Sequence, residues 1–480
     1  MPLRVLRLAC VIAALAGTLS SRARALTPAS PGEFTPEAER TLGRVVLGLD
    51  PNQTKLFMMP ETAVWDPKAR DSRVRWLRRQ LYRLNFELIH GQIFRHWPRQ
   101  SRFFISVPDP RTTPESLGNE EELFREHLKE RVGWTDRQID ERVRFFKIPE
   151  PVPYPQDMTE PIGYDSKGRL VLALGDDVDA VYREAAQRLA AAFPEDFVIR
   201  PVVDVNTEGG DLALVRLPEG NVGLLIGHNR VARWVRRRYP GTPEGAPLPK
   251  TRIEEARRAY QTAFGGVETI VIGPEALTDP RLDNPEIYHI DMLVAVLRTP
   301  TGIVAFVPTY EGTPVDAVSN DQLSPQAVSR FQGEFDRTAR QLAQRGYRVA
   351  RVPFADHPAR NPVGIAKFID PNSGKPWVIL GRYPDHLPGP GKRSPHADLQ
   401  RTLERLDEAV AAWRTDPSEA RWQGVRSAVA ASWKEFDASV AAPNPIFERQ
   451  RKIYESYGVG VAPLPIFPTG EGGVHCLVLK

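Results

Sequence analysis

The order of apolar and polar positions predicts a mixed α/β chain in which short strands alternate with amphipathic helices. Short apolar runs bounded by turn residues are typical of buried strands, and apolar positions recurring every three or four residues are typical of helices. Strands are predicted at 102–107, 170–174, 213–215, 222–226, 269–272, 292–297, 303–307 and 347–352. Helices are predicted within 120–146 and at 179–192, 251–264 and 324–345. Strand-strand-helix-strand groupings therefore recur, without a residue-level repeat.

One segment, about 395–440, has a purely helical pattern. Its apolar residues recur at spacings of three and four, namely Leu399, Leu403, Leu406, Val410, Trp413, Trp422, Val425, Val429 and Trp433. Asp416-Pro417 interrupts the pattern, which predicts a helical hairpin that turns there. The hairpin is interpreted as an insertion with core-facing helices that covers one side of a pocket, and a partner-binding helix pair is the alternative.

The N-terminus has the features of an export signal. Arg4 and Arg7 precede an apolar run at 8–19, and Ala23-Arg24-Ala25 offers a cleavage site. The run is too short to span a bilayer. We therefore expect a signal peptide at 1–25 and a periplasmic or extracellular location, with a buried N-terminal helix as the alternative.

Removing that signal changes the charge of the chain. The full sequence has 64 basic and 60 acidic residues, and residues 1–25 hold four arginines and no acid, so the mature chain is balanced at 60 and 60. The excess of basic residues in the full sequence lies in the predicted signal, so it gives no reason to expect nucleic-acid or anionic-membrane binding. No later stretch approaches 18 apolar residues, so we expect no membrane span. Residues 26–54 are predicted to form a leader ending in a short helix.

Of the two cysteines, Cys10 lies in the predicted signal, so the mature chain keeps Cys476 alone. An unpaired cysteine in an exported protein is a candidate reactive thiol. Cys476 follows a Gly-Gly pair and His475, a plausible setting for a nucleophile approached closely by backbone. The alternative is a small buried apolar residue, since free cysteine is often buried.

Four short polar stretches stand out against the apolar strands. They are 154–161, 206–212, 288–292 and the tail 472–480. Each is weak evidence alone, because a polar strand end, an ordinary glycine turn or a solvated acid explains it equally well. In sequence order they read acid, Glu-Gly-Gly-Asp, His-x-Asp and Gly-Gly-x-His-Cys.

That order resembles the pentein superfamily of guanidine-modifying enzymes, from about Pro151 to Lys480. The superfamily includes arginine, agmatine and bacterial peptidylarginine deiminases, dimethylarginine dimethylaminohydrolases and amidinotransferases. The resemblance implies an α/β fold that forms a five-bladed propeller of ββαβ units, with the active site in its central channel. It also implies a single catalytic domain at 55–480 that carries the helical insertion.

The resemblance implies a role for each polar residue. Asp157 and Asp291 would hold a planar guanidinium with charge-assisted hydrogen bonds. Cys476 would attack its central carbon as a thiolate, giving an S-alkylthiouronium intermediate. His289 would protonate the leaving amine and then activate water, and Glu208 would orient His289. This chemistry requires no metal or organic cofactor.

Three further residues are assigned through the same resemblance. Asp211 would brace the Glu208 loop. Arg230 would bind a substrate carboxylate, or else be a surface arginine that opens a helix at 230–238. His475 is expected to be structural or to line the site. Agmatine deiminases have Arg-Asp, then Gly-Pro, where this chain has Gln156-Asp157 and Glu160-Pro161.

Several functions remain open from the sequence. A hydrolase and an amidinotransferase would share all these residues. A metal-dependent hydrolase using Glu208, Asp211, His289 and His475 lacks an H-E-x-x-H pair. A non-catalytic guanidine-binding protein has no need of a lone thiol. The expected partner is a small guanidino compound (arginine, agmatine or methylarginine) or the arginine side chain of a peptide.

Overall fold

The computed structural model describes most of the chain between residues 34 and 465, and these residues form five three-stranded sheets. The described ranges are 34–40, 43–48, 71–112, 119–150, 152, 155–242, 248–273, 289–312, 314, 323–355, 362–382 and 395–465. Strands consecutive in sequence pair within each sheet. The fold is therefore an α/β assembly of five consecutive units, and none of the sheets described closes into a barrel.

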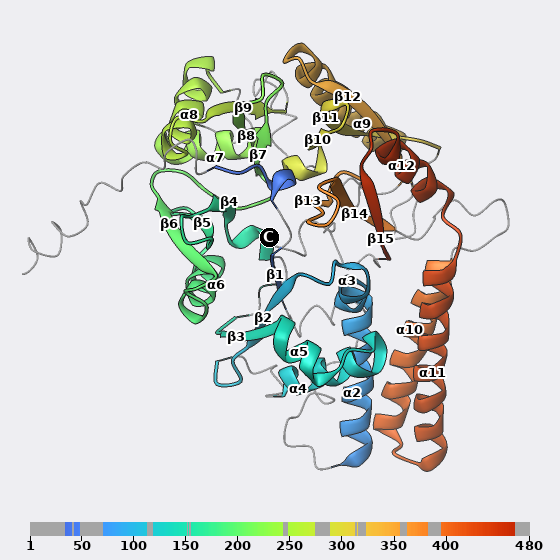
Figure 1. The fold of residues 1–480 in the computed structure, drawn as a ribbon. Helices are drawn as coiled ribbons and strands as arrows, with labels where there is room; N and C mark the ends of the chain where they lie inside the picture. Colours follow the sequence, from blue (N-terminus) through green and yellow to red (C-terminus); the bar gives the residue numbers. More distant parts are fainter. Residues whose placement is uncertain are drawn as a thin grey trace, which may run out of the picture.

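Units two to five share one strand topology, in which a hairpin is followed by a helical crossover. The two hairpin strands are antiparallel, and the third strand runs parallel to the second. A short loop can join only antiparallel neighbours, whereas a parallel neighbour requires a longer crossover. The recurring strand-strand-helix-strand groupings of the sequence follow from this topology (Figure 1).

The elements of these four units follow in chain order. Unit two contains β4 (Glu160–Tyr164), β5 (Leu170–Gly175), α6 (Ala180–Ala192) and β6 (Phe197–Val202). Unit three contains β7 (Leu212–Arg216), β8 (Val222–Gly227), α7 (His228–Arg238), α8 (Lys250–Ala263) and β9 (Glu268–Ile272). Unit four contains β10 (Ala295–Thr299), β11 (Gly302–Tyr310), α9 (Pro325–Gln344) and β12 (Arg348–Phe354). Unit five contains β13 (Ala366–Ile369), β14 (Pro376–Arg382), α10 (Pro395–Thr415), α11 (Glu419–Ala441), α12 (Pro445–Ser456) and β15 (Gly460–Pro465).

Unit one differs because helices occupy both of its connections, and both strand pairings are parallel. Its elements are β1 (Arg44–Gly48), α2 (Ser72–Phe86), the π-helix η5 (Glu87–Gly91), α3 (Gln92–His96), β2 (Arg102–Pro108), α4 (Glu120–His127), the π-helix η6 (Leu128–Val132), α5 (Asp136–Arg142) and β3 (Val143–Ile148).

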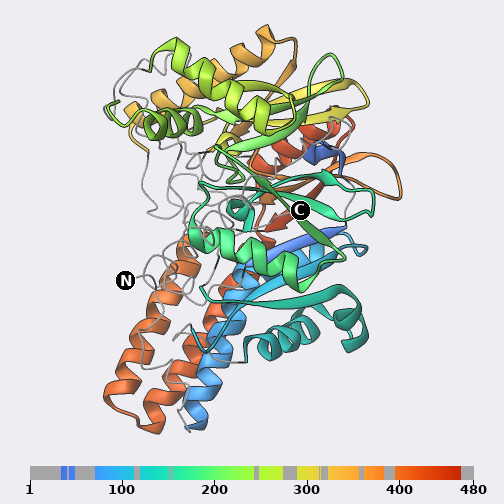
Figure 2. The ribbon, with the colours of Figure 1, turned by 90° about the vertical axis from the view of Figure 1, so that its left-hand side faces the viewer.

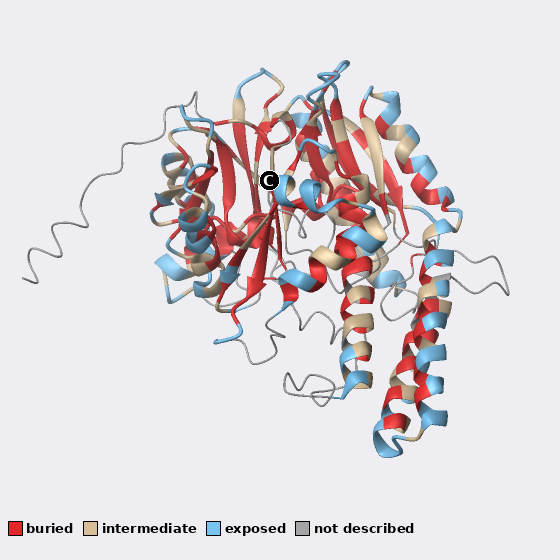
Figure 3. Ribbon diagram, turned by 60° about the horizontal axis from the view of Figure 1, so that its bottom comes forward, coloured by how far each residue is buried: buried red, intermediate tan, exposed pale blue. Residues whose placement is uncertain are grey.

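Each sheet buries its two faces against different neighbours. Side chains alternate along a strand, so Leu224 of β8 joins a core shared with unit two, and Leu225 joins one shared with unit four. In the same way Phe104 of β2 packs with unit two, while Phe103 packs with unit five. A further core joins units four and five. The continuous apolar runs of the sequence are therefore strands buried on both faces (Figure 3).

The predicted helical hairpin is formed by α10 and α11, which turn at Asp416-Pro417. Its apolar face packs on α2 in a separate core of Leu77, Leu81, Leu406, Val410, Trp413, Trp422, Val425 and Val429. The core-facing interpretation of these helices is therefore confirmed. Figures 1 and 2 show the three helices side by side, extending beyond the sheets.

The sequence analysis did not predict β4, β6, β13, β14 or β15, and three further regions differ from its predictions. Arg44–Gly48, inside the predicted leader, forms β1 and pairs with β2 because its apolar side chains are buried. The predicted helical region up to 146 ends earlier, since the aromatic and β-branched run of β3 pairs with β2 instead. The strand predicted at 292–297 begins only at Ala295, because 290–292 forms a 3-10 turn, η9.

No helix among the described residues is long and apolar enough to cross a bilayer. The predicted signal peptide at 1–25, including Cys10, lies outside the described residues, as do His475 and Cys476. Export and the thiol therefore stay predictions.

Candidate active site

Asp157 lies in the 3-10 turn η7 (Pro155–Met158), directly before β4. The turn is wholly buried, and the Asp157 side chain is buried with it. Among the described residues, the Oδ1 atom of Asp157 has no hydrogen-bond partner. A buried carboxylate oxygen without a donor is costly, so this position favours a cationic or hydrogen-bonding ligand.

Glu208 lies in the loop between β6 and β7, and the loop is held by its own hydrogen bonds. The side-chain oxygen of Asn206 accepts from the Glu208 amide at 2.7 Å, and the Asn206 amide group donates to the Asp177 carbonyl at 2.6 Å. Such an Asx turn fixes the backbone two residues on. Asn206, which the sequence analysis did not single out, thus presets the direction of Glu208.

The two glycines that follow Glu208 allow the surrounding segments to approach it. A Cβ atom on Gly209 would lie 2.3 Å from the Gln156 carbonyl oxygen, and one on Gly210 would lie 2.6 Å from the His289 Nδ1. Gly210 also has a φ of 92°, which favours glycine. The Gly-Gly pair therefore lets the loop fit between η7 and His289.

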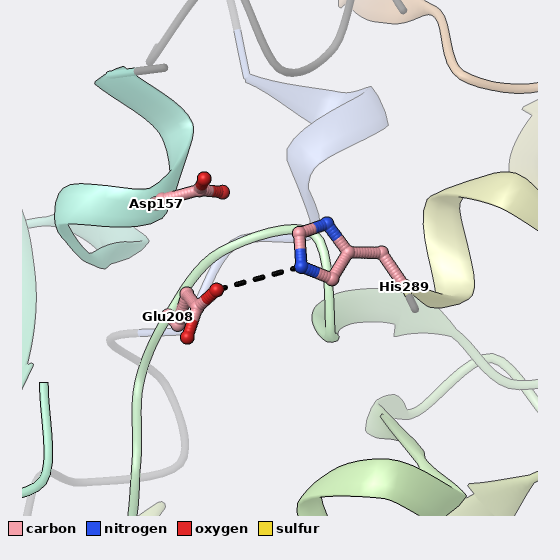
Figure 4. A group of neighbouring side chains, drawn as sticks. All are labelled: Asp157, Glu208 and His289. Atoms are coloured by element: carbon pink, nitrogen blue, oxygen red, sulfur yellow. Dashed lines mark ion pairs between the residues drawn. The ribbon is translucent and has the colours of Figure 1, made fainter. Parts of the chain in front are cut away.

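His289 immediately precedes η9 and turns its ring toward Glu208. The His289 Nε2 lies 3.5 Å from Glu208 Oε1. Figure 4 marks this pair with a dashed line. The next turn is anchored to the same loop, because the Asp291 amide donates to the Gly210 carbonyl at 3.1 Å. Units two, three and four thus each supply a polar side chain to one place, and Asp291 is buried beside them.

Arg230 lies in the first turn of α7 and pairs with two carboxylates. Its Nη2 lies 2.6 Å from Glu208 Oε2, and its Nε donates to Asp211 Oδ2. Arg230 is only 6% exposed, so the surface-arginine interpretation is wrong. The guanidinium instead joins the Glu208 loop to the start of α7.

The charged groups of the site shift one another's pKa values. Burial raises the pKa of Asp157 to about 7, against the opposing charges of His289 and Arg230. The carboxylates of Glu208 and Asp291 add to the rise. Burial also opposes ionisation of Glu208, but the hydrogen bond to His289 and the charge of Arg230 outweigh it and hold the Glu208 pKa below its ordinary value. Near neutral pH, Glu208 is therefore ionised while Asp157 changes its protonation state.

The same three side chains also have the geometry of a partial metal site. One ligand atom each from Asp157, Glu208 and His289 lies within 4.8 Å of the others. Two carboxylates and one imidazole suit a divalent ion. The site therefore offers either three metal ligands or an acid-base group with two carboxylates.

Six of the residues singled out from the sequence are brought together here: Asp157, Glu208, Asp211, Arg230, His289 and Asp291. Cys476 and His475 lie outside the described residues. Gln156 and Asn206 were not singled out as site residues, because their contribution depends on which loops meet. The Asn-x-Glu spacing at 206–208 was the one available signal for an Asx turn.

No protein-family model matches this chain, and no curated protein matches its sequence. Among solved structures, a protein assigned as an arginine deiminase from Porphyromonas gingivalis is similar over 93% of this chain and 97% of its own, at 14% identity and a TM-score of 0.44. A C. jejuni agmatine deiminase with substrate bound is similar over 93% of this chain and 95% of its own, at 12% identity and a TM-score of 0.42. Both are deiminases of the superfamily that the motif order resembles. At these scores, we base the function on this chain's own residues.

Replacing Gly210 with alanine should displace His289, because the new Cβ would meet the ring. Gly220→Ala is a matched control, since Gly220 has a φ of 93° but no atom within 4 Å of a Cβ. Both variants should lose about 1–2 kcal/mol of stability from the left-handed backbone. Crystal structures should show a moved His289 ring only in Gly210→Ala, and an unmoved ring there would contradict this account of the loop.

Replacing Asp157 with asparagine should stabilise the protein at neutral and alkaline pH. The pKa of Asp157 is raised from 3.8 to about 7, so the folded state binds more protons than the unfolded state between these values. The stability of the wild-type chain should therefore fall as the pH rises through this window, at about 1.4 kcal/mol per unit of pKa shift. Melting temperatures of Asp157→Asn should exceed the wild type at pH 8 and converge with it near pH 4.

Asp165→Asn is a control in which the change in stability at pH 8 should have the opposite sign. Although burial opposes ionisation of Asp165, hydrogen bonds from Arg169 lower its pKa, so losing this carboxylate should reduce stability at pH 8. If Asp157→Asn also melts below the wild type at pH 8, the ionised Asp157 carboxylate does not destabilise the folded protein, and this account is contradicted.

Proposed function

We propose that this chain is an exported guanidino-group hydrolase, a deiminase that converts an arginine-type guanidinium into a ureido group. The observation that carries the proposal is the buried Asp157, whose Oδ1 has no hydrogen-bond partner among the described residues, facing the Glu208–His289 pair. A guanidinium is a planar cation with five N–H donors that match carboxylate oxygens. It would supply both the charge and the donor that Asp157 needs.

In this proposal Asp157 and Asp291 hold the guanidinium and expose its central carbon. Binding a cation would favour the ionised form of Asp157. Since protonated Asp157 cannot hold the cation as strongly, substrate affinity should decline below about pH 7. Glu208 adds negative charge nearby, which favours entry of a cation over a neutral compound.

The proposed reaction has two steps on Cys476. The thiolate forms a bond to the guanidinium carbon, His289 gives a proton to one amino group, and the C–N bond breaks to release ammonia. This leaves an S-alkylthiouronium on the enzyme. His289 then removes a proton from water, the water oxygen bonds to the same carbon, and the C–S bond breaks to restore the thiolate. The proton left on the product oxygen is lost to solvent, where the released ammonia takes up a proton, and the neutral ureido product leaves.

The geometry of the acid-base pair supports this assignment. A general acid or base needs a partner that fixes its ring orientation, and Glu208 Oε1 lies 3.5 Å from His289 Nε2. This separation is longer than a tight hydrogen bond, and such contacts often shorten only when the substrate is bound. The His289 side chain is partly exposed, at 16%.

We also propose that the five units are the blades of a propeller. Supporting this arrangement, the hydrophobic cores link each unit to the next, and one of them links unit five to unit one. The site then lies where units two, three and four meet. Export through the predicted signal at 1–25 makes peptide arginine a suitable substrate beside free guanidines.

The proposal is tested with a colorimetric assay for ureido products on residues 26–480. Arginine, agmatine, methylarginine and an arginine peptide are each offered to the wild type and to Cys476→Ala. We expect product from at least one substrate, none from Cys476→Ala, and a loss of about 10²–10⁴-fold in kcat for His289→Gln.

A chelator separates this reaction from metal-dependent hydrolysis at Asp157, Glu208 and His289. Activity should survive chelation, and metal analysis should find no stoichiometric ion. Loss of activity on chelation with recovery on adding a divalent ion would contradict the thiol mechanism. No product from a folded wild-type protein would redirect the assignment to amidino transfer or to guanidine binding.

A further inference from the structure

The placement of Arg230 is unusual for a helix start. A cation in the first turn of a helix opposes the helix dipole, which favours negative charge there. Arg230 is also buried, and burial disfavours its charge. Asp211 and Glu208 outweigh both effects and raise the pKa of Arg230 above its ordinary value, so it stays charged. The two carboxylates therefore hold the arginine where it is.

The surrounding backbone is shaped to keep this cluster together. The amide of Gly227 donates to the Asp211 carbonyl at 3.0 Å, which brings the ends of β7 and β8 together. A Cβ atom on Gly227 would lie 2.7 Å from Asp211 Oδ1. Gly227 thus makes room for the Asp211 carboxylate directly before α7, within reach of Arg230.

The contacts divide the Glu208 carboxylate between two partners. Oε2 lies 2.6 Å from Arg230 Nη2, while Oε1 faces His289 Nε2 at 3.5 Å. With Arg230 Nε bound to Asp211, the guanidinium cannot turn without breaking one of its two ion pairs. Arg230 therefore fixes the rotation of the Glu208 carboxylate through Oε2, while Oε1 faces His289.

We propose that Arg230 is a positioning residue, which together with Asp211 holds Glu208 in the orientation that aligns His289, and that it does not bind the substrate carboxylate. This inference rests on the proposed function for its kinetic consequence. It differs from the role that the family resemblance implied for Arg230. It also means that arginine and agmatine, which differ in a carboxylate, are not distinguished by this residue.

The rival role would use the remaining guanidinium nitrogen of Arg230. Nε and Nη2 of Arg230 are bound to Asp211 and Glu208, and Nη1 is buried without a hydrogen-bond partner among the described residues. A substrate carboxylate at Nη1 would make Arg230 a specificity residue. The two roles predict different kinetics, because positioning acts on kcat and carboxylate binding acts on KM.

The kinetic test compares Arg230→Gln and Arg230→Lys on arginine and on agmatine. Positioning predicts that Arg230→Gln lowers kcat by about 10–100-fold on every substrate that the wild type turns over, with KM changed less than about threefold. Arg230→Lys should recover only part of the loss, since an ammonium lacks the planar fork that binds two carboxylates. A rise in KM for arginine alone, with kcat unchanged, would overturn the proposal.

Arg237→Gln is the matched control on the same helix. Arg237 is exposed and pairs with Asp176, Asp177 and Asp204, but no contact joins it to Glu208 among the interactions described. Its loss removes an arginine and its ion pairs from α7 without touching the site. Kinetics like those of Arg230→Gln would show that general weakening of α7, and not positioning, explains the effect.

Crystal structures give a readout that does not depend on activity. In Arg230→Gln the Glu208 carboxylate should rotate, and its distance to His289 Nε2 should exceed 3.5 Å. If Arg230→Gln does not fold, Arg230→Lys serves, with a smaller displacement expected. An unchanged Glu208 would overturn the positioning role. A wild type inactive on all guanidines would instead reject the proposed function and leave this structural result to decide the role of Arg230.

Discussion

The site depends on one electrostatic conflict, a buried Asp157 placed close to two other carboxylates. Burial and the charges of Glu208 and Asp291 raise the pKa of Asp157 to about 7, so the folded chain keeps an acid that is poorly suited to its surroundings. Such conflicts cluster at functional sites, because a ligand can relieve them. A guanidinium relieves this one with both charge and hydrogen bonds, so the same interaction that destabilises the empty site would provide affinity for the substrate.

The fold brings these groups together by close packing of loops at the ends of units two, three and four. Gly209 and Gly210 are central, because any side chain at either position would meet the segment that carries Asp157 or the ring of His289. Rigid sheets, each buried on both faces, hold the loops in place. Precise positioning of an acid-base pair needs this kind of support, since small displacements reduce catalysis strongly.

The sequence predicted eight of the fifteen strands described and the α10–α11 hairpin, because apolar periodicity depends on local sequence. It did not predict β1, β3, β4, β6 or the three strands of unit five. The short run of β1, for example, is recognisable only once β2 lies beside it. In the site, the motifs correctly grouped Glu208 with His289. They did not reveal that Arg230 meets Asp211 and Glu208, because that contact depends on how the β7–β8 hairpin returns the chain. Ion pairs between residues that are far apart in the sequence depend on the tertiary structure, which the spacing of motifs does not predict.

The most direct test of the central claim is calorimetric binding of agmatine or arginine to Cys476→Ala, which cannot turn the ligand over. Measured at pH 6 in buffers of different ionisation enthalpy, binding should release close to one proton per site, because the cation lowers the pKa of Asp157 from about 7. The release should vanish and the affinity should fall when Asp157→Asn is added. Binding without proton release, or binding that Asp157→Asn leaves unchanged, would contradict a guanidinium site built on this carboxylate.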